Sequence, residues 1–323
     1  MPEPSAPMEE PATLRLRIAQ AAPVPPYLVI LGTAQDGGYP QAGCRGACCR
    51  AAWDEPAIRR SIASAAVVVP AAAGRAARRW LVDATPDLRA QLHQLDGLAP
   101  PEDGAPAPAL AGILLTHGHI GHVLGLLQLG REAMGARRVP VYAMPRLLEI
   151  LATNAPWREL VGLGHVALRP LRAGAAVPLG GGVTATPLAV PHRAEMGETV
   201  GFCIRGPERS VLYLPDIDGW DAALDGQAPP SLATRLAGVD VAYLDGTFGS
   251  ADELPRRDRS TIPHPTIEDT LARLAGAPEA QRRKVRFTHL NPTNPAMDPA
   301  AALVAAVRAA GCDLAEDGEC VPL

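Results

Sequence analysis

The segment THGHIGH, residues 116–122, places His117, His119 and His122 within six positions. It follows an apolar run that is typical of a buried strand, and it precedes a stretch predicted to be helical. A loop between a strand and a helix can turn several imidazole rings toward one point, and neutral imidazole is the commonest protein ligand of zinc-like ions. The spacing therefore predicts a metal centre rather than an incidental polar turn.

Two more histidines and two carboxylates lie just after predicted strands. His192 and His289 follow apolar, β-branched runs, so both are candidate metal ligands. Asp216 and Asp245 end similar runs, and a carboxylate there costs desolvation energy unless it meets a metal ion, an arginine or several donors. We predict that Asp216 binds metal and that Asp216, Asp245 and His122 act in catalysis. A purely structural cap is the alternative for both carboxylates.

The elements that must position these residues alternate along the chain. Short apolar runs predict strands at 27–31, 64–69, 80–83, 112–116, 139–143, 183–190, 201–205, 211–214, 239–244 and 285–288, and helices are expected at 86–95, 123–134, 145–154, 266–275 and 299–310. Two β-rich halves with helices outside predict an α/β sandwich that is covered on both faces. Asp83 ends one of these strands, and we expect it to fix a histidine ring or the loop backbone.

Composition bounds the class of protein. Residues 27–323 form one domain, and residues 1–26, rich in Pro, Ala and Glu, predict a disordered leader. With 47% hydrophobic residues and a net charge of −4, the chain can bury a large core and lacks the basic surface that nucleic acid or an anionic membrane requires. Six unevenly placed cysteines do not form a secreted disulfide framework, so we expect a cytoplasmic protein with no membrane span.

The histidine segment resembles the signature of the metallo-β-lactamase superfamily, whose fold is an αββα four-layer sandwich. The resemblance implies a first metal site of His117, His119 and His192, a bridging Asp216, and a second site that His122 and His289 reach. It implies one or two catalytic zinc ions, with iron or manganese as the alternative metals.

One residue departs from that signature. Gly121 stands where the superfamily has an aspartate that helps to hold the second metal and to orient the attacking water. Asp245, Asp218 or a water molecule would fill the gap, or the second metal would bind weakly. These alternatives stay open at the level of sequence.

A closer resemblance extends over nearly the whole chain after residue 27, to the family of coenzyme PQQ synthesis protein B. The matching stretches are 32–41, 84–92, 245–248 and 291–295. Typical members have lost much of the histidine signature that this chain keeps, so it resembles a divergent branch whose substrate need not be a quinone precursor. Relatives that form dimers imply a homodimer.

The same family, like the related phosphodiesterases of phosphonate breakdown, carries a cysteine cluster that binds a structural zinc. In this chain Cys44, Cys48 and Cys49 lie within six residues. Three thiolates can collect zinc if a fourth ligand arrives, and His264, which lies between two prolines, is the candidate. A loop with free thiols is the alternative for the cysteines, and a structural role is the alternative for His264.

Three functions follow from these residues. The first is a metal-dependent hydrolase that acts on an ester, lactone, amide or phosphodiester of a small molecule or peptide. The second, implied by the PQQ resemblance and favoured somewhat by Gly121, is an iron-dependent oxygenase. The third is a non-catalytic carrier of a PQQ-like product. Segment 256–265 is expected to border the pocket, with the arginines at 256, 257 and 259 as candidate anion ligands.

Overall fold

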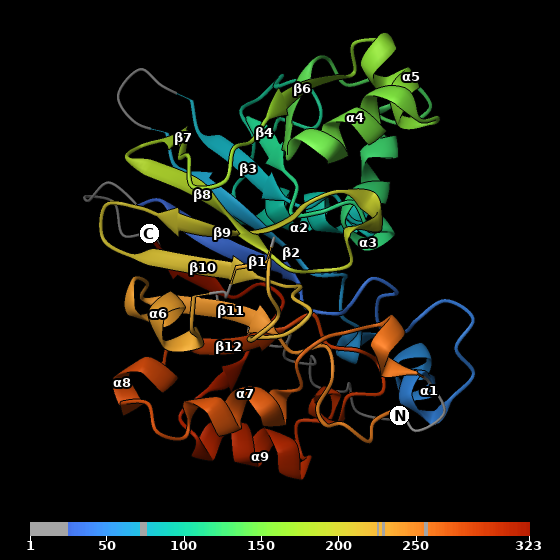
Figure 1. The fold of residues 1–323 in the computed structure, drawn as a ribbon. Helices are drawn as coiled ribbons and strands as arrows, with labels where there is room; N and C mark the ends of the chain where they lie inside the picture. The colour runs from blue at the N-terminus through green and yellow to red at the C-terminus, as the bar shows by residue number, and fades with distance from the viewer. Residues whose placement is uncertain (1–24, 72–75, 225, 228–229, 255–257) are drawn as a thin grey trace, which may run out of the picture.

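Two seven-stranded sheets form the centre of the protein in a computed structural model, which describes residues 25–71, 76–224, 226–227, 230–254 and 258–323 (Figure 1). The first sheet contains β1 (Tyr27–Gly32), β2 (Ser64–Val69), β3 (Arg78–Val82), β4 (Gly112–Leu114), β5 (Val139–Ala143), β6 (Val166–Pro170) and β14 (Cys320–Pro322), in the order β14-β1-β2-β3-β4-β5-β6. The second contains β7 (Val177–Gly180), β8 (Val183–Val190), β9 (Thr199–Arg205), β10 (Ser210–Leu214), β11 (Val241–Asp245), β12 (Val285–Thr288) and β13 (Asp313–Leu314), in the order β13-β12-β11-β10-β9-β8-β7. The predicted leader lies outside the described residues up to residue 24.

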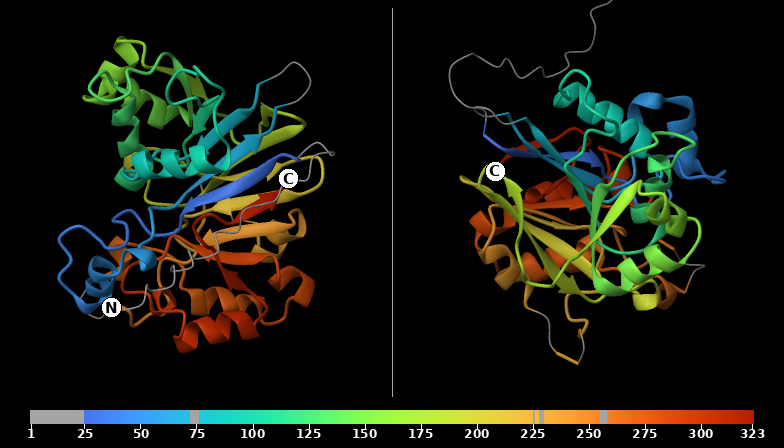
Figure 2. Two further views of the ribbon diagram at one scale, coloured as in Figure 1. Left: turned by 180° about the vertical axis from the view of Figure 1, so that it is seen from behind. Right: turned by 90° about the horizontal axis from the view of Figure 1, so that it is seen from above.

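Helices cover the outer face of each sheet (Figure 2). The α-helices are α1 (Ala47–Asp54), α2 (Leu88–Leu98), α3 (Ile120–Val123), α4 (Pro145–Thr153), α5 (Trp157–Gly162), α6 (Leu232–Ala237), α7 (Ile267–Leu274), α8 (Glu279–Arg282) and α9 (Ala302–Ala309); the 3-10 turns are η1 (Pro56–Ile58), η2 (Leu124–Leu129), η3 (Ala194–Met196), η4 (Arg259–Thr261) and η5 (Pro295–Met297). Apolar side chains of α2, α4 and α5 pack on the first sheet, and those of α6, α7 and α9 pack on the second. The predicted four-layer αββα sandwich is therefore confirmed. None of the helices in the described ranges has the length and apolar character needed to cross a bilayer.

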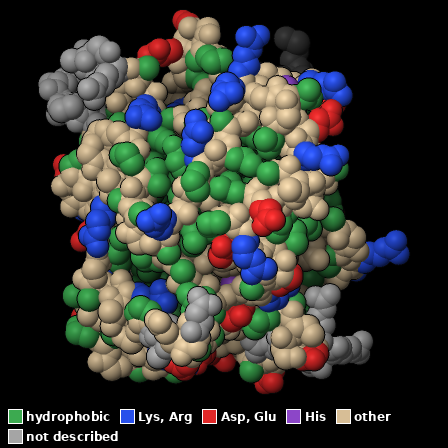
Figure 3. Space-filling view, turned by 45° about the horizontal axis from the view of Figure 1, so that its top comes forward, with side chains coloured by type: hydrophobic (Ala, Val, Ile, Leu, Met, Phe, Trp, Pro, Cys, Tyr) green, Lys and Arg blue, Asp and Glu red, His purple; other side chains and the backbone are tan. Residues whose placement is uncertain are grey.

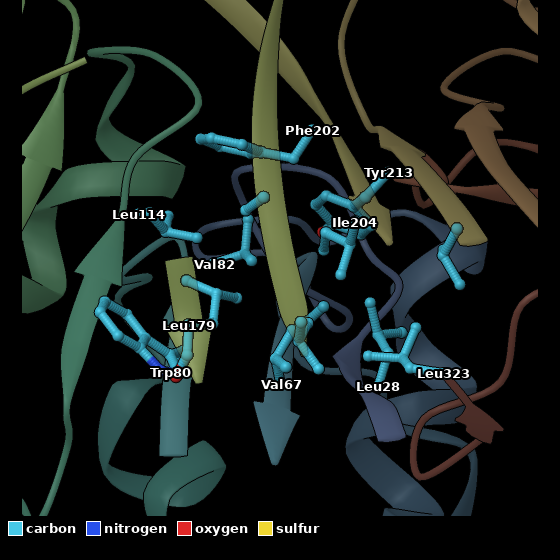
Figure 4. Close-up of a cluster of buried hydrophobic side chains, with 14 of the residues drawn as sticks. Leu28, Val67, Trp80, Val82, Leu114, Leu179, Phe202, Ile204, Tyr213 and Leu323 are labelled. Carbon is cyan, nitrogen blue, oxygen red and sulfur yellow. Dashed lines mark hydrogen bonds between the residues drawn. The ribbon is translucent and has the colours of Figure 1, made fainter. Parts of the chain in front are cut away.

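The space between the sheets is filled by apolar side chains from both (Figure 4). Leu28 and Val67 of the first sheet face Phe202 and Tyr213 of the second, and all four are buried. Trp80 belongs to the same cluster, where its indole N–H donates to the Leu179 carbonyl at 2.9 Å. Burial of a large apolar side chain contributes about 1.5–3 kcal/mol, so this layer holds the two sheets together.

The strands that precede the candidate ligands end at one edge of the sandwich. In the first sheet β1 and β3 each pair antiparallel with β2, and β4 pairs parallel with β3. In the second sheet β10, β11 and β12 run parallel, while β8 and β10 each pair antiparallel with β9. Loops that leave these strand ends therefore meet, although the residues they carry are far apart in the sequence.

Most predicted strands match the structure, and one predicted helix does not. β2, β5, β8 and β12 have the expected bounds. The helix expected at 123–134 is wrong: the chain forms α3 and then the 3-10 turn η2. The reason is tertiary, because the backbone here bonds to the loop after β3: Ala84 N donates to His122 O and Gly125 N donates to Ala84 O, both at 2.8 Å.

Close approach of two backbone segments makes Gly32 a sensitive position. A Cβ atom added to Gly32 would lie 2.1 Å from the Ile62 carbonyl oxygen, whereas one added to Gly97, inside α2, meets no heavy atom within 4 Å. We expect Gly32→Ala to lower the free energy of unfolding by about 1–3 kcal/mol. Gly97→Ala should raise it by about 0.5–1 kcal/mol through helix propensity. Urea denaturation checks both, and equal midpoints for the two variants would contradict this packing.

Candidate metal centre

Six of the predicted metal ligands converge at the shared edge of the two sheets. They are His117, His119, His122, His192, Asp216 and His289. They come from the loops after β4, β8, β10 and β12, and all are buried. Very little histidine surface, drawn in purple, is visible on the face of the molecule that Figure 3 shows. The sequence prediction that these residues share one site therefore agrees with their positions.

The first group of ligands consists of His117, His119 and His192. His117 Nε2 lies 2.9 Å from His119 Nδ1, and the His192 ring centroid lies 5.2 Å and 5.0 Å from the other two rings. Ligands that each lie about 2.0–2.1 Å from one zinc ion are separated by about 3–3.5 Å. The ligand atoms of the three rings lie within 4.8 Å of one another, so the rings are close enough to share one ion.

The second group consists of His122, His289 and Asp36. Asp36 Oδ1 lies 3.1 Å from His122 Nε2 and 3.5 Å from His289 Nε2. Asp36 was missed as a site residue in the sequence, although it lies in the loop just after the first strand. That position, shared with the other candidate ligands, is the signal that could have identified it.

Asp216 lies between the two groups. Its Oδ1 atom is 3.7 Å from His192 Nε2 and 3.5 Å from His289 Nε2, and its Oδ2 atom is 3.3 Å from His122 Nε2. One carboxylate thus faces ligands of both groups. This is the position that a bridging ligand would occupy.

Buried polar atoms without partners mark the same point. Among the described residues, His122 Nε2, His192 Nε2, His289 Nε2, Asp36 Oδ1 and Asp216 Oδ2 are buried and have no hydrogen-bond partner of acceptable geometry. Leaving such atoms unpaired is costly, most of all for a carboxylate. Nitrogen and carboxylate oxygen donors are the ligands that zinc, iron and manganese accept, so the side chains fit a metal centre of this kind.

Hydrogen bonds behind the ligands orient the rings. Asp83 Oδ2 accepts from His122 Nδ1 at 2.8 Å, and Asp83 Oδ1 accepts from the Thr116 backbone N–H at 2.7 Å. His192 Nδ1 donates to Asp218 Oδ1 at 3.0 Å. Each bond leaves the Nε2 atom of its ring directed at the centre. Asp83 therefore does both of the things that we expected of it.

Charge and burial set the protonation of the ligands. Burial lowers the pKa of His117 well below its usual range, and burial together with the Arg193 charge lowers the pKa of His119 to about 4. Both rings are neutral near pH 7, which is the form that binds metal. For His122 burial acts in the same direction, but the charges of Asp83 and Asp216 raise the pKa well above the ordinary value.

Asp245 and His264 form a pair, and both differ from their predicted roles. Asp245 is fully buried and accepts hydrogen bonds from Ile217 N, from Thr247 and from His264 Nδ1, the last at 2.7 Å. Its oxygens therefore hold neighbouring groups in place, so the geometry does not support a direct catalytic role for Asp245. These contacts engage both oxygens of Asp245, so Asp245 does not supply the carboxylate that is missing at Gly121.

His264 lies in the histidine cluster rather than with the cysteines. Its ring centroid is 5.1 Å from that of His192 and 5.9 Å from that of His289. The prediction that His264 completes a cysteine site is therefore wrong. Sequence could not show this, because the loop that carries His264 is positioned by its contact with the Asp245 carboxylate.

The three cysteines do come together as a separate group. The Sγ atoms of Cys44, Cys48 and Cys49 lie within 4.8 Å of one another, with 3.6 Å between Cys44 and Cys48. None forms a disulfide. Burial raises the pKa of Cys49 to about 12, so without a cation this side chain is a neutral thiol. The geometry fits three ligands of one zinc ion with a fourth position open.

A cavity of about 130 Å³ opens beside the second group. Its wall includes Asp36, Asp216 and His264, together with Ile262 from the segment expected to border the pocket. Arg193 also lines it, with Nη2 3.2 Å from His119 Nδ1. Two arginines expected to receive an anion, at 256 and 257, lie outside the described residues.

Comparisons with known proteins agree with this architecture. A family model described as the β-lactamase superfamily domain matches residues 78–290. Coenzyme PQQ synthesis protein B of Xanthomonas campestris pv. campestris (strain B100) is 31% identical over 313 residues, which cover 90% of this chain and 98% of that protein.

Solved structures give the same result. A Zn²⁺-bound PqqB from Methylobacterium extorquens aligns with a TM-score of 0.72 at 27% identity, over 92% of this chain and 100% of that one. A diphosphatase from the PhnP family aligns with a TM-score of 0.58 at 23% identity, over 92% and 96% of the chains, and shows the fold alone. The chain therefore belongs to the β-lactamase superfamily and, within it, to the coenzyme PQQ synthesis protein B family.

Proposed function

We propose that this protein is a metal-dependent hydrolase that acts on an ester, lactone, amide or phosphodiester of a small molecule or peptide. The observation that carries the proposal is the set of buried, unpartnered nitrogen and oxygen atoms, which falls into two groups on either side of Asp216. When bound there, metal ions would supply a water nucleophile at neutral pH and polarise the bond to be cleaved.

The protein's own residues would bind the substrate and move its protons. The Arg193 guanidinium lies in the cavity wall, in a long ion pair of 3.9 Å with the half-exposed Glu195 carboxylate, and its charge suits an anionic group of the substrate. The His264 ring lines the same cavity, and Asp245 holds its Nδ1 atom. A histidine positioned in this way can deliver a proton to the leaving group.

An iron-dependent oxygenase in coenzyme PQQ synthesis is the second candidate. Similarity over 90% of the chain to proteins named for that synthesis supports it. Several histidines with carboxylates also suit ferrous iron when coordination positions stay open. Both candidates use the same ligands, so metal preference and oxygen use separate them.

The test starts from protein stripped of metal and reconstituted with one metal at a time. Turnover of anionic phosphodiesters, lactones or peptides with zinc or manganese, without oxygen, would support the hydrolase. Oxygen consumption that requires ferrous iron would contradict it and support the oxygenase. Binding of PQQ with no turnover under any metal would contradict both and indicate a carrier.

We also propose a structural zinc ion at Cys44, Cys48 and Cys49, with a fourth ligand that is not His264. The gathered thiols support this site. In the Cys44→Ser/Cys49→Ser variant, elemental analysis should show one zinc fewer than in the parent, with the remaining metal unchanged. An unchanged zinc content would contradict it.

A further inference from the structure

Because residue 121 is glycine, the second group of ligands lacks the carboxylate expected at that position, and a different part of the chain supplies one. We propose that Asp36, from the loop after β1, is the carboxylate ligand of a second metal ion and replaces the aspartate that Gly121 lacks. This inference rests on the proposed metal-dependent function. It deepens that proposal by restoring a full second site.

The position of Asp36 fits a ligand better than it fits an ion-pair partner. Its Oδ1 atom lies 3.1 Å from His122 Nε2 and 3.5 Å from His289 Nε2. None of these three atoms has a hydrogen-bond partner of acceptable geometry among the described residues, despite the short distances. Three ligand atoms that approach one another without forming hydrogen bonds point to a common centre. Their separations match those between ligands of one metal ion.

The space at residue 121 is the second argument. A Cβ atom added to Gly121 would lie 2.2 Å from Asp36 Oδ1, 2.6 Å from Asp36 Cγ and 2.7 Å from the Asp36 backbone Cα. The Asp36 carboxylate therefore occupies the volume into which a side chain at 121 would extend. Glycine at 121 and aspartate at 36 are mutually dependent: the carboxylate can reach the centre only if residue 121 has no side chain.

The loop that carries Asp36 is fixed to the strand end that carries His289. Gln35 N donates to Leu290 O at 3.0 Å, and Leu290 N donates to Thr33 O at 2.8 Å. These two bonds join the segment just before Asp36 to the residue just after His289. Asp36 is thus held in place by backbone hydrogen bonds, as a ligand on a rigid element should be.

Asp36 also faces the substrate cavity. Its side chain is 26% exposed, and it lines the cavity together with Asp216 and His264. A metal ion held by Asp36 would consequently border the space that a substrate enters. This placement links the ligand to catalysis and not only to stability.

Zinc binding to the metal-free protein tests the assignment without any substrate. With a competing chelator, the parent should bind one more equivalent than Asp36→Ala, or bind that equivalent on the order of 100-fold more tightly, the upper end of what loss of an outer partner produces. Asp36→Asn, of nearly the same shape, should behave like Asp36→Ala. Asp218→Ala is the matched control: it should weaken the equivalent held by His192 and spare the one assigned to Asp36.

An exchange of the two residues is the sharper test. Gly121→Asp alone should lower the melting temperature of the metal-free protein, because its Cβ would collide with Asp36 and two carboxylates would share one space. Asp36→Gly/Gly121→Asp removes the carboxylate from this collision but leaves the Cα of residue 36 only 2.7 Å from the added Cβ, so the loop must also shift. Recovery of the equivalent that Asp36→Gly loses would show that a carboxylate from either residue serves the same site.

The outcomes separate this inference from the proposed function. If Asp36→Ala and Asp36→Asn keep every equivalent at parental affinity, Asp36 is not a ligand, while metal dependence through His117, His119 and His192 stands. If the parent binds no zinc outside the cysteines, both proposals fail. Loss of that equivalent in both Asp36 variants, with the same equivalent retained in Asp218→Ala, establishes the assignment.

Discussion

Replacing His117 and His119 by alanine is expected to abolish metal binding at the first group of ligands and all turnover with it. The two rings supply Nε2 and Nδ1 atoms only 2.9 Å apart, and both belong to the first group of ligands. An ion present at about 1,000 times its dissociation constant stabilises the folded state by about 4 kcal/mol, and the variant should lose this increment. Elemental analysis and melting with and without zinc measure both effects.

His93→Ala is the control for removal of a histidine elsewhere in the chain, because His93 is exposed on α2 and is not one of the residues assigned to the metal centre. It should bind as much metal as the parent. Zinc that remains in the double variant is expected at the cysteines and at the second group of ligands. If the double variant binds the parent's full complement of metal, the first group is not a metal site.

Replacing Asp83 by alanine is expected to have the second largest effect, because one buried carboxylate holds both His122 and the loop before His117. Asp83→Ala leaves the Thr116 N–H without its acceptor, and leaves His122 Nδ1 with only the Thr116 hydroxyl, 3.4 Å away. Removing one member of a buried charged pair costs about 3–5 kcal/mol of stability. Metal affinity should fall about 10–100-fold, since the ring is no longer oriented.

Asp83→Asn separates the two consequences. Its amide oxygen can still accept from Thr116 N, so most of the stability should return. Its amide nitrogen faces His122 Nδ1 and, by donating to it, would favour the tautomer that carries a proton on Nε2, so metal affinity should stay low. Chelator titration and urea denaturation of the three proteins provide the measurements. Equal metal affinity in all three would show that Asp83 does not orient His122.

The strands could be predicted from sequence because their signal is local. The run at β2 is short and apolar with three valines, and all six of its residues are buried; β12 is buried at all of its residues except Arg286. The turn η2 could not be predicted, because a helical pattern was overridden by hydrogen bonds to Ala84, which is far away in the sequence. The hydrophobic pattern of a segment therefore predicts its secondary structure only where tertiary packing favours the same structure.

The ligands after β4, β8, β10 and β12 could be predicted for a related reason. Each follows an apolar strand directly, so the end of the strand locates the side chain. Asp36 was overlooked although it also follows a strand, whereas His264 could not be placed, since its loop is positioned by a tertiary contact with Asp245. Asp83 and His289 also adopt left-handed backbone conformations, with φ of 66° and 62°, which no residue pattern reveals.

Anomalous scattering at the zinc absorption edge, from crystals of the zinc-loaded parent, tests the central claim most directly. The account predicts one peak between His117, His119 and His192, and a second between Asp36, His122 and His289, with Asp216 between the two peaks. A peak at the cysteines alone, with none among the histidines, would contradict the assignment of a metal centre to this edge of the sandwich.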